Sequence, residues 1–417
     1  MRSFLLVLAI AMPTGELLAS GTVESGISFK QLIDVAHTKS PDVQIANLET
    51  RARISESRSS YGRLAPEIGV EGGARSNREM EKRNDLFYYG YARLELSLKE
   101  IFDLKAALHR KDAAELERSQ ITAKTERVLA DLFYAAVLLQ EQVSLRKEDI
   151  ELTEKQIAQA KKRVSGGLAT DTDLLEFAMH QQEARNDLEV LEQELQRELR
   201  ELERFSGLNK IEKLSADFIA PKVAPNFDEV WARVQNSNLE LRKAKSESGV
   251  ARSEKSSVLG AYLPKLSAEA QYGKLMETDF IESRKNSWAV VGKVTVPLFN
   301  GLSSWNQYQA KSYESEKASV SEAQTTVRLK NLTSHLIEKI ERLKRKVDGE
   351  TANVSTASKY YQAVVSEYRR GVKNSPDMAG ATDKLFAAKL RLLETERDLS
   401  ITTMELLALQ GKSLEEL

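Results

Sequence analysis

The sequence predicts a mainly α-helical protein with a small β part, built from two copies of a long helical hairpin and four amphipathic strands. Three observations predict this fold class. Apolar heptads run further than in an ordinary globular helix, the same heptads recur about 200 residues later, and four short segments alternate apolar with polar residues. We therefore expect one elongated repeat protein rather than several compact domains.

The first hairpin is predicted over residues 99–205, with a rising arm that ends near residue 164. Two apolar series lie on this arm, Ala136, Val143, Ile150, Ile157 and Val164 on one side and Leu138, Leu145 and Leu152 on another. Two seams on one helix require two packed neighbours. Gly166 and Gly167 form the predicted turn. At 1.5 Å per residue the arm is about 100 Å long, so it is suited to span a distance.

The second hairpin repeats the first after a shift of 204 residues. The shifted series is Ile340, Val347, Val354, Tyr361 and Tyr368. Gly371 takes the place of Gly167 at the turn, and Gly411 takes the place of Gly207 at the end of the descending arm. Two matched sets in one register indicate an internal duplication.

The two repeats and their flanking segments divide the chain. Residues 1–21 have the charged start, apolar stretch and small residues of a secretory signal peptide. We expect the first repeat over residues 22–208, a connector over 209–226, the second repeat over 227–412 and a tail over 413–417. No later stretch offers 18 consecutive apolar residues, so a membrane crossing would have to be made by strands.

Each repeat is predicted to begin with two helices followed by two strands. In the first repeat these are helices over 29–37 and from Pro41 to about 64, with Ser40 as N-cap, and strands over 67–75 and 87–98. The second repeat follows the same order. Four residues mark the predicted junctions between strands and helices: Pro66, Pro264, Pro297 and Gly301.

The four strands have the length and alternation of strands that cross a bilayer. In the third, Leu266, Ala268, Ala270 and Tyr272 alternate with Lys265, Ser267, Glu269 and Gln271. Two soluble, half-buried hairpins would also show such alternation. Aromatic residues near the loop ends favour the membrane as an interfacial girdle, namely Phe87, Tyr88, Tyr89, Tyr272 and Trp288. Four strands cannot close a barrel in lipid, so we expect an oligomer.

Composition and motifs argue against other functions. The net charge of -1 shows no polybasic surface for nucleic acid, and the absence of Cys excludes disulfides and zinc–cysteine sites. The four histidines, His37, His109, His180 and His335, have no metal-ligand spacing. Gly411-Lys412-Ser413 lacks the earlier glycine of a phosphate-binding loop. We expect no enzyme activity, no metal and no cofactor.

Three short motifs carry a resemblance to a known family. They are residues 262–267 (YLPKLS) entering a strand, residues 297–301 (PLFNG) leaving one, and Gly167-Leu168 with Thr172-Asp173-Leu174 at the first hairpin turn. With them the chain resembles the TolC-type outer membrane efflux protein family over nearly its whole mature length. The resemblance implies a homotrimer whose twelve strands form one barrel in the outer membrane and whose helices form an α-barrel tunnel in the periplasm.

The resemblance also implies a function and partners. The protein would be the passive exit channel of a tripartite efflux or type I secretion system, joined to a periplasmic adaptor (membrane fusion) protein and an inner-membrane pump. A soluble periplasmic coiled-coil adaptor or scaffold is the alternative, since it would also be secreted and rich in heptads. The exported substrate, whether drug, metal ion or polypeptide, stays open.

The family's gate maps onto residues near the two hairpin turns. Thr172 and Asp173 match positions on the first hairpin, Tyr368 matches a gating tyrosine, and Lys373 replaces a usual arginine. We expect hydrogen bonds from Tyr368 to Asp173 and from Lys373 to hold the tip closed.

Asp377 matches an acidic ring at the pore constriction, whereas Gly380 stands at a second acidic position. Asp173 and Asp377 could instead stabilise helix N-termini.

Overall fold

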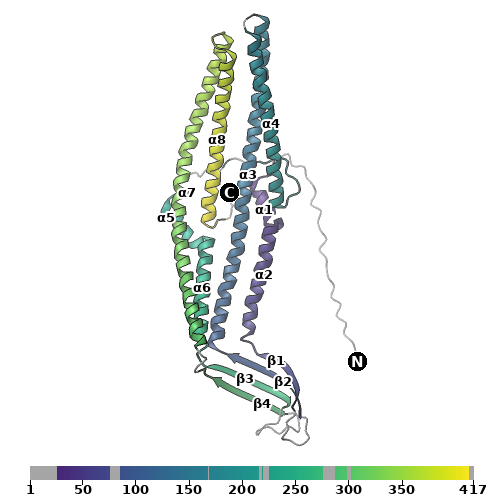
Figure 1. Ribbon diagram of the computed structural model, residues 1–417, viewed down its shortest axis with the longest axis vertical. Helices are drawn as coiled ribbons and strands as arrows, with labels where there is room; N and C mark the ends of the chain where they lie inside the picture. The colour runs from purple at the N-terminus through teal and green to yellow at the C-terminus, as the bar shows by residue number, and fades with distance from the viewer. Residues whose placement is uncertain are drawn as a thin grey trace, which may run out of the picture.

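A computed structural model describes residues 26–75, 85–167, 169–215, 218, 225–275, 287–297 and 302–412. Long helices stand side by side, a sheet lies at one end and two hairpin turns lie at the other (Figure 1). The predicted fold class is confirmed: the chain is mostly helical with four antiparallel strands. The predicted signal, the predicted tail and Gly301 lie outside the described residues.

The two halves have the same order of elements. The first contains α1 (Phe29–Lys39), α2 (Pro41–Gly62), β1 (Glu67–Arg75), β2 (Asp85–Leu96), α3 (Leu98–Ser165) and α4 (Asp171–Ser206). The second contains α5 (Phe227–Ser237), α6 (Leu239–Gly260), β3 (Lys265–Lys274), β4 (Ser287–Thr295), α7 (Ser303–Arg369) and α8 (Ser375–Leu409). The long arms α3 and α7 have 68 and 67 residues.

Local capping moves two of the predicted boundaries. β2 ends at Leu96 rather than at residue 98, because the Ser97 side chain accepts a hydrogen bond from the Glu100 amide and starts α3. Ser40 stands at the N-cap of α2, as predicted, but its hydroxyl is buried and finds no hydrogen-bond partner among the described residues. The start of α2 therefore depends on Pro41 at N1.

The four strands form one antiparallel sheet in the order β1-β2-β3-β4, so β2 and β3 join the two repeats. The register places the apolar members of the predicted alternation that lie within β1 to β4 on one face. That face carries Ile68, Val70, Ala74, Leu86, Tyr88, Ala92, Leu94, Leu96, Leu266, Ala268, Ala270, Tyr272, Trp288, Val290 and Val294. Among the described residues most of its larger side chains are exposed: Val70, Trp288 and Val290 are 85%, 74% and 66% exposed.

The opposite face is polar and hydrogen-bonded between strands. The Arg93 guanidinium on β2 donates to Glu269 on β3 at 2.9 Å, and the Tyr91 hydroxyl donates to Glu67 on β1 at 3.0 Å. The Tyr91 side chain packs over Gly69, where a Cβ would lie 2.7 Å from its Cζ and hydroxyl oxygen. The absence of a side chain on Gly69 therefore makes room for the ring. The sheet therefore has one apolar face and one mainly polar face.

The predicted aromatic girdle is present in part. Tyr88, Tyr272 and Trp288 lie on the apolar face near the loop end, as a girdle requires. Phe87 and Tyr89 lie on the polar face, where their rings stack 6.1 Å apart and the Tyr89 hydroxyl donates to Glu71 at 2.9 Å. Assigning these two residues to a lipid-facing girdle was wrong.

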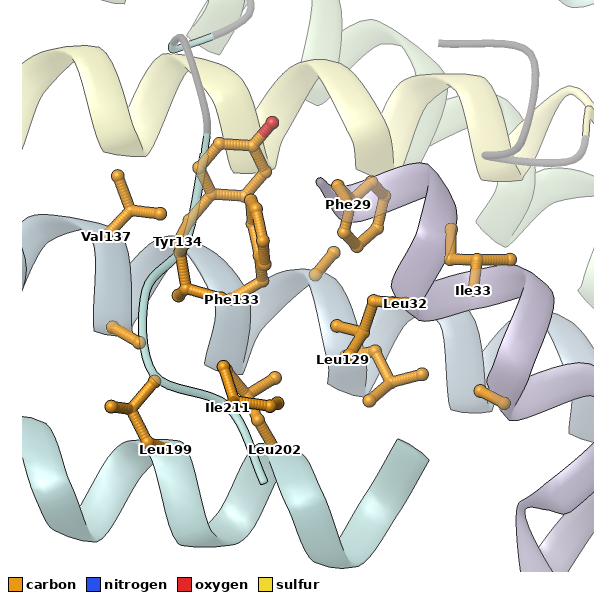
Figure 2. Close-up of a cluster of buried hydrophobic side chains, with 14 of the residues drawn as sticks. Phe29, Leu32, Ile33, Leu129, Phe133, Tyr134, Val137, Leu199, Leu202 and Ile211 are labelled. Atoms are coloured by element: carbon orange, nitrogen blue, oxygen red, sulfur yellow. The ribbon is translucent and has the colours of Figure 1, made fainter. Parts of the chain in front are cut away.

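The main hydrophobic core lies in the middle of the molecule, where α1 packs on the first hairpin. Figure 2 shows Phe29 of α1 against Phe133 and Tyr134 of α3, with Leu202 of α4 nearby. The ring centroids of Phe29 and Phe133 are 5.3 Å apart. A second cluster joins α5 to α7 and α8 in the other repeat. The short helix that begins each repeat thus packs against both arms of its hairpin, α1 against α3 and α4 and α5 against α7 and α8.

By length and composition α3 would suit a membrane span, alone among the described helices. Its residues Leu129, Phe133, Tyr134 and Val137 are buried in the first core cluster. Part of its apolar character is therefore used in packing within the protein.

We predict that Phe133→Ala destabilises the protein by about 3 to 5 kcal/mol, because it removes a fully buried ring and leaves a cavity. The measurement is the midpoint of heat-induced unfolding. Leu175→Ala, at an exposed position of α4, is the control and should cost less than about 0.5 kcal/mol. Equal losses of stability in Phe133→Ala and Leu175→Ala would mean that Phe133 does not belong to the core.

Candidate functional site at the hairpin tips

The two hairpin turns lie at the end of the molecule far from the sheet (Figure 1). Gly167 and Gly371 adopt left-handed backbone angles, with φ of 68° and 78°, which explains why glycine occupies both turns. Gly166 is the C-cap of α3, and its amide donates to the Lys162 carbonyl. At the sheet end of the molecule, Pro66 and Pro264 immediately precede β1 and β3, and Pro297 follows β4.

Each descending helix starts with a reciprocal capping box at its tip. On α4, the Thr170 hydroxyl accepts from the Asp173 amide and Asp173 accepts from the Thr170 amide at 2.9 Å. On α8, Asn374 and Asp377 exchange the same two hydrogen bonds. Both aspartates therefore stabilise helix N-termini, the alternative role that their positions in the sequence allow.

A side-chain hydrogen bond connects the starts of the two descending helices. The Ser375 hydroxyl, at the start of α8, donates to Asp173 Oδ1 on α4 at 2.5 Å. This bond, followed by the bond from the Thr170 amide, lowers the pKa of the Asp173 carboxyl. Asp173 thus caps its own helix and holds the neighbouring hairpin.

The prediction of a hydrogen bond from Tyr368 to Asp173 is wrong. Tyr368 is 2% exposed, and its hydroxyl has no hydrogen-bond partner among the described residues. Its ring instead packs edge-on against Phe177 of α4, with centroids 6.0 Å apart. The Arg163 guanidinium of α3 lies 4.5 Å from the centre of the same ring and donates to the Tyr368 carbonyl. Tyr368 therefore joins the hairpins through its ring and backbone.

The ion pair that Lys373 makes among the described residues lies within its own hairpin. The Lys373 Nζ lies 3.5 Å from Asp377 Oδ1, on the first turn of its own hairpin's descending helix. Thr172 is exposed on the first turn of α4. At Gly380 an added Cβ would meet nothing within 4 Å, so the position has space for a side chain. In the part of the chain that the structure describes, Asp173 and Tyr368 are the predicted gate residues that make a hydrogen bond or ring contact with the other hairpin.

Sequence reasoning missed the partners of these two residues. Arg163 and Phe177 lie on the first hairpin, about 200 residues from Tyr368, and no spacing within one helix reveals such a contact. Ser375 precedes Pro376 at the start of α8. From the sequence, a serine at this position suggests only a role in starting its own helix. The strongest available signal was the three-residue spacing from Thr170 to Asp173 and from Asn374 to Asp377, which is typical of capping boxes.

Comparison with protein families gives one match over most of the chain. The profile of the family described as outer membrane efflux protein matches residues 32–208 and 231–412. Among curated protein sequences none matches.

Several solved structures share the fold. A membrane protein from Pseudomonas aeruginosa has a TM-score of 0.78 at 15% identity, covering 98% of both chains. The outer membrane protein VceC from Vibrio cholerae has a TM-score of 0.76 at 14% identity, covering 92% of this chain and 96% of its own. The CmeC outer membrane channel from Campylobacter jejuni has a TM-score of 0.77 at 13% identity, covering 97% and 94%.

We predict that Asp173→Asn and Ser375→Ala are coupled by about 0.5 to 1.5 kcal/mol at neutral pH in a double-mutant cycle. Because the folded-state pKa of Asp173 is lowered, its contribution is present above the ordinary pKa of about 3.9 and is lost as pH falls toward the lowered value. In Ser375→Ala the Asp173 pKa is lowered less, so the loss should be smaller and should be complete at a higher pH. Unfolding midpoints at several pH values provide the measurement.

Thr172→Ala is the control for this cycle, since Thr172 is exposed beside Asp173. It should show no coupling to Ser375→Ala. Additive effects of Asp173→Asn and Ser375→Ala would mean that their hydrogen bond does not stabilise the tip.

Proposed function

The chain belongs to the outer membrane efflux protein family, and on that premise we propose that it is the passive exit duct of a tripartite efflux or type I secretion system. It is an outer-membrane protein. The observation that carries the proposal is the continuous apolar face over all four strands, most of whose large side chains are exposed among the described residues. A lipid environment would cover that face, while the polar face would line a water-filled lumen.

The sheet supports assembly into a homotrimer. β1 and β4 are its two edges, and each has nine residues, close to the 9–11 of a tilted membrane strand. In lipid these edges need partners. Pairing β4 of one copy with β1 of the next would close twelve strands from three copies.

The helices would continue the duct into the periplasm. An α-helix of 68 residues is about 100 Å long, and the hairpin tips lie at the end away from the sheet (Figure 1). The partners we propose are a periplasmic adaptor protein and an inner-membrane pump, which would approach this end. The duct would need no cofactor and no reaction centre, because the pump would supply the energy and select the substrate.

A soluble periplasmic adaptor or scaffold does not account for the sheet. Such a protein gains nothing from Val70, Trp288 and Val290 exposed together on one face, since exposed apolar patches favour aggregation in water. Family membership also argues for the channel.

We predict that Val290→Lys lowers barrel stability by about 2 to 4 kcal/mol, because a cation would face lipid near the middle of β4. The adjacent Val291→Lys is the matched control. Val291 is 54% exposed on the polar face, opposite Glu269, so a lysine there should be tolerated. The measurement is the yield of heat-resistant oligomer in outer-membrane fractions. Equal sensitivity at both positions would contradict the assignment of faces.

We predict that the purified protein conducts ions in planar bilayers and that Asp377→Asn lowers its preference for cations. Three copies of the tip would place three Asp377 carboxylates around the entrance, and the substitution removes that ring of charge. Asp42→Asn, at an exposed aspartate on the first turn of α2, is the control and should leave the preference unchanged. A protein that inserts as an oligomer and conducts no ions would refute the duct; an unchanged preference in Asp377→Asn would place the constriction elsewhere.

A further inference from the structure

A single histidine links the two hairpins between the core and the tips. His180 lies on α4 with its side chain 14% exposed. Its Nε2 is 2.9 Å from Asp383 Oδ1 on α8, and its Nδ1 is 3.3 Å from Thr153 Oγ1 on α3. One imidazole therefore contacts both the rising arm of its own hairpin and the descending arm of the other.

A buried carboxylate lies next to this imidazole. Asp149 on α3 is 1% exposed; Arg146 donates to its Oδ2 at 2.9 Å, and its Oδ1 has no hydrogen-bond partner among the described residues. Burial raises the pKa of the Asp149 carboxyl, while a positive charge on His180 would be the main influence opposing that rise. Asp383 adds to the rise, since two carboxylates repel each other.

The charges around His180 come from all three packed helices. Asp149 and Arg146 lie on α3, Asp187 lies on α4 at 3.0 Å from Arg146, and Asp383 lies on α8. Arg146 pairs with two of these carboxylates, Asp149 and Asp187. Close by, Lys389 of α8 pairs with Glu148 of α3 at 2.8 Å. A protonated imidazole adds a further positive charge between the two hairpins, and it lies beside Asp383.

The duplication does not explain this cluster. The shift of 204 residues places Lys384 at the position of His180, Met179 at that of Asp383, and Asn353 at that of Asp149. These residues cannot form an imidazole–carboxylate pair. The cluster is therefore specific to the junction of α3 and α4 with α8 inside one chain.

We propose that His180 is the proton-sensing element of a latch that holds the two hairpins together in mild acid. When protonated, its Nε2–H donates to Asp383 as a charge-assisted hydrogen bond and its charge attracts Asp149. When neutral, it leaves Asp383 without a charged partner among the described residues, and the carboxylates of Asp149 and Asp383 repel each other. Histidine is the side chain that changes charge between about pH 5 and 8.

The direction of the pH effect follows from which state binds the proton. The latched state holds the imidazole beside Asp383 and Asp149, so a positive charge on the ring adds attraction that the released state lacks. The latch is therefore strong in mild acid and weakens as pH rises through the histidine range.

Distances between labels on the two hairpins test the latch directly. The natural chain has no cysteine, so Asn186→Cys on α4 and Glu394→Cys on α8 give a unique pair of spin-label sites. Labelled chains are diluted into unlabelled chains so that only distances within one chain are measured. We expect the short-distance population to be dominant at about pH 5.5 and to fall severalfold at about pH 8.

Substitutions separate the latch from general pH effects. His180→Gln should abolish the pH-dependent change, and Asp383→Asn should reduce it while keeping the imidazole. His335→Gln, at an exposed histidine on α7, should behave like the unsubstituted protein. Identical distances at both pH values, or a change that persists in His180→Gln, would overturn the proposal.

The consequence for transport rests on the proposed function as a duct. Tighter hairpins should lower single-channel conductance severalfold at about pH 5.5 relative to about pH 8, and His180→Gln should remove this difference. Because the distance measurement needs no conduction, it still judges the latch if the protein forms no channel. A pH-dependent distance with pH-independent conductance would overturn the role of the latch in transport.

Discussion

Every backbone N–H and C=O of a strand in lipid must be hydrogen-bonded, and this chain cannot meet that requirement alone. Among the described residues each strand pairs with the next one along the chain, in the order β1-β2-β3-β4. The outer edges of β1 and β4 are therefore open. The helices pose a related problem, because Tyr313, Val320 and Val327 lie exposed at heptad spacing along α7. A strip of this kind suits another helix. The free edges and the exposed strip have a common explanation if the folded chain is one part of a closed ring.

The periodicity of the sequence was enough to predict the fold. Heptads located the long arms, and alternation located the strands and their two faces, because burial imposes both periods directly. Boundaries depended on single side chains such as Ser97, whose hydroxyl ends β2 by capping α3. The error over Phe87 and Tyr89 came from grouping aromatic residues by position along the strand. Their odd numbers place them opposite Tyr88, and the parity of the strand could have shown this.

The candidate site was less predictable, for a physical reason. A capping box joins residues three apart, so the roles of Asp173 and Asp377 at helix starts can be inferred from local spacing. Contacts between hairpins depend on how each long helix is rotated about its axis. That rotation decides that Arg163 rather than Asp173 meets Tyr368, and that Ser375 meets Asp173. It is set by the packing of whole helices, which no short motif encodes.

The glycine beneath the Tyr91 ring has a consequence for the width of the proposed lumen. Because Gly69 has no Cβ, the ring lies against the wall of the sheet, where its hydroxyl is held by Glu67. Gly73 provides the same space for the Phe87 ring. In a closed barrel, alanine at either position would push an aromatic ring toward the central axis. The width of the lumen would therefore depend partly on having glycine, with no side-chain methyl group, at positions 69 and 73.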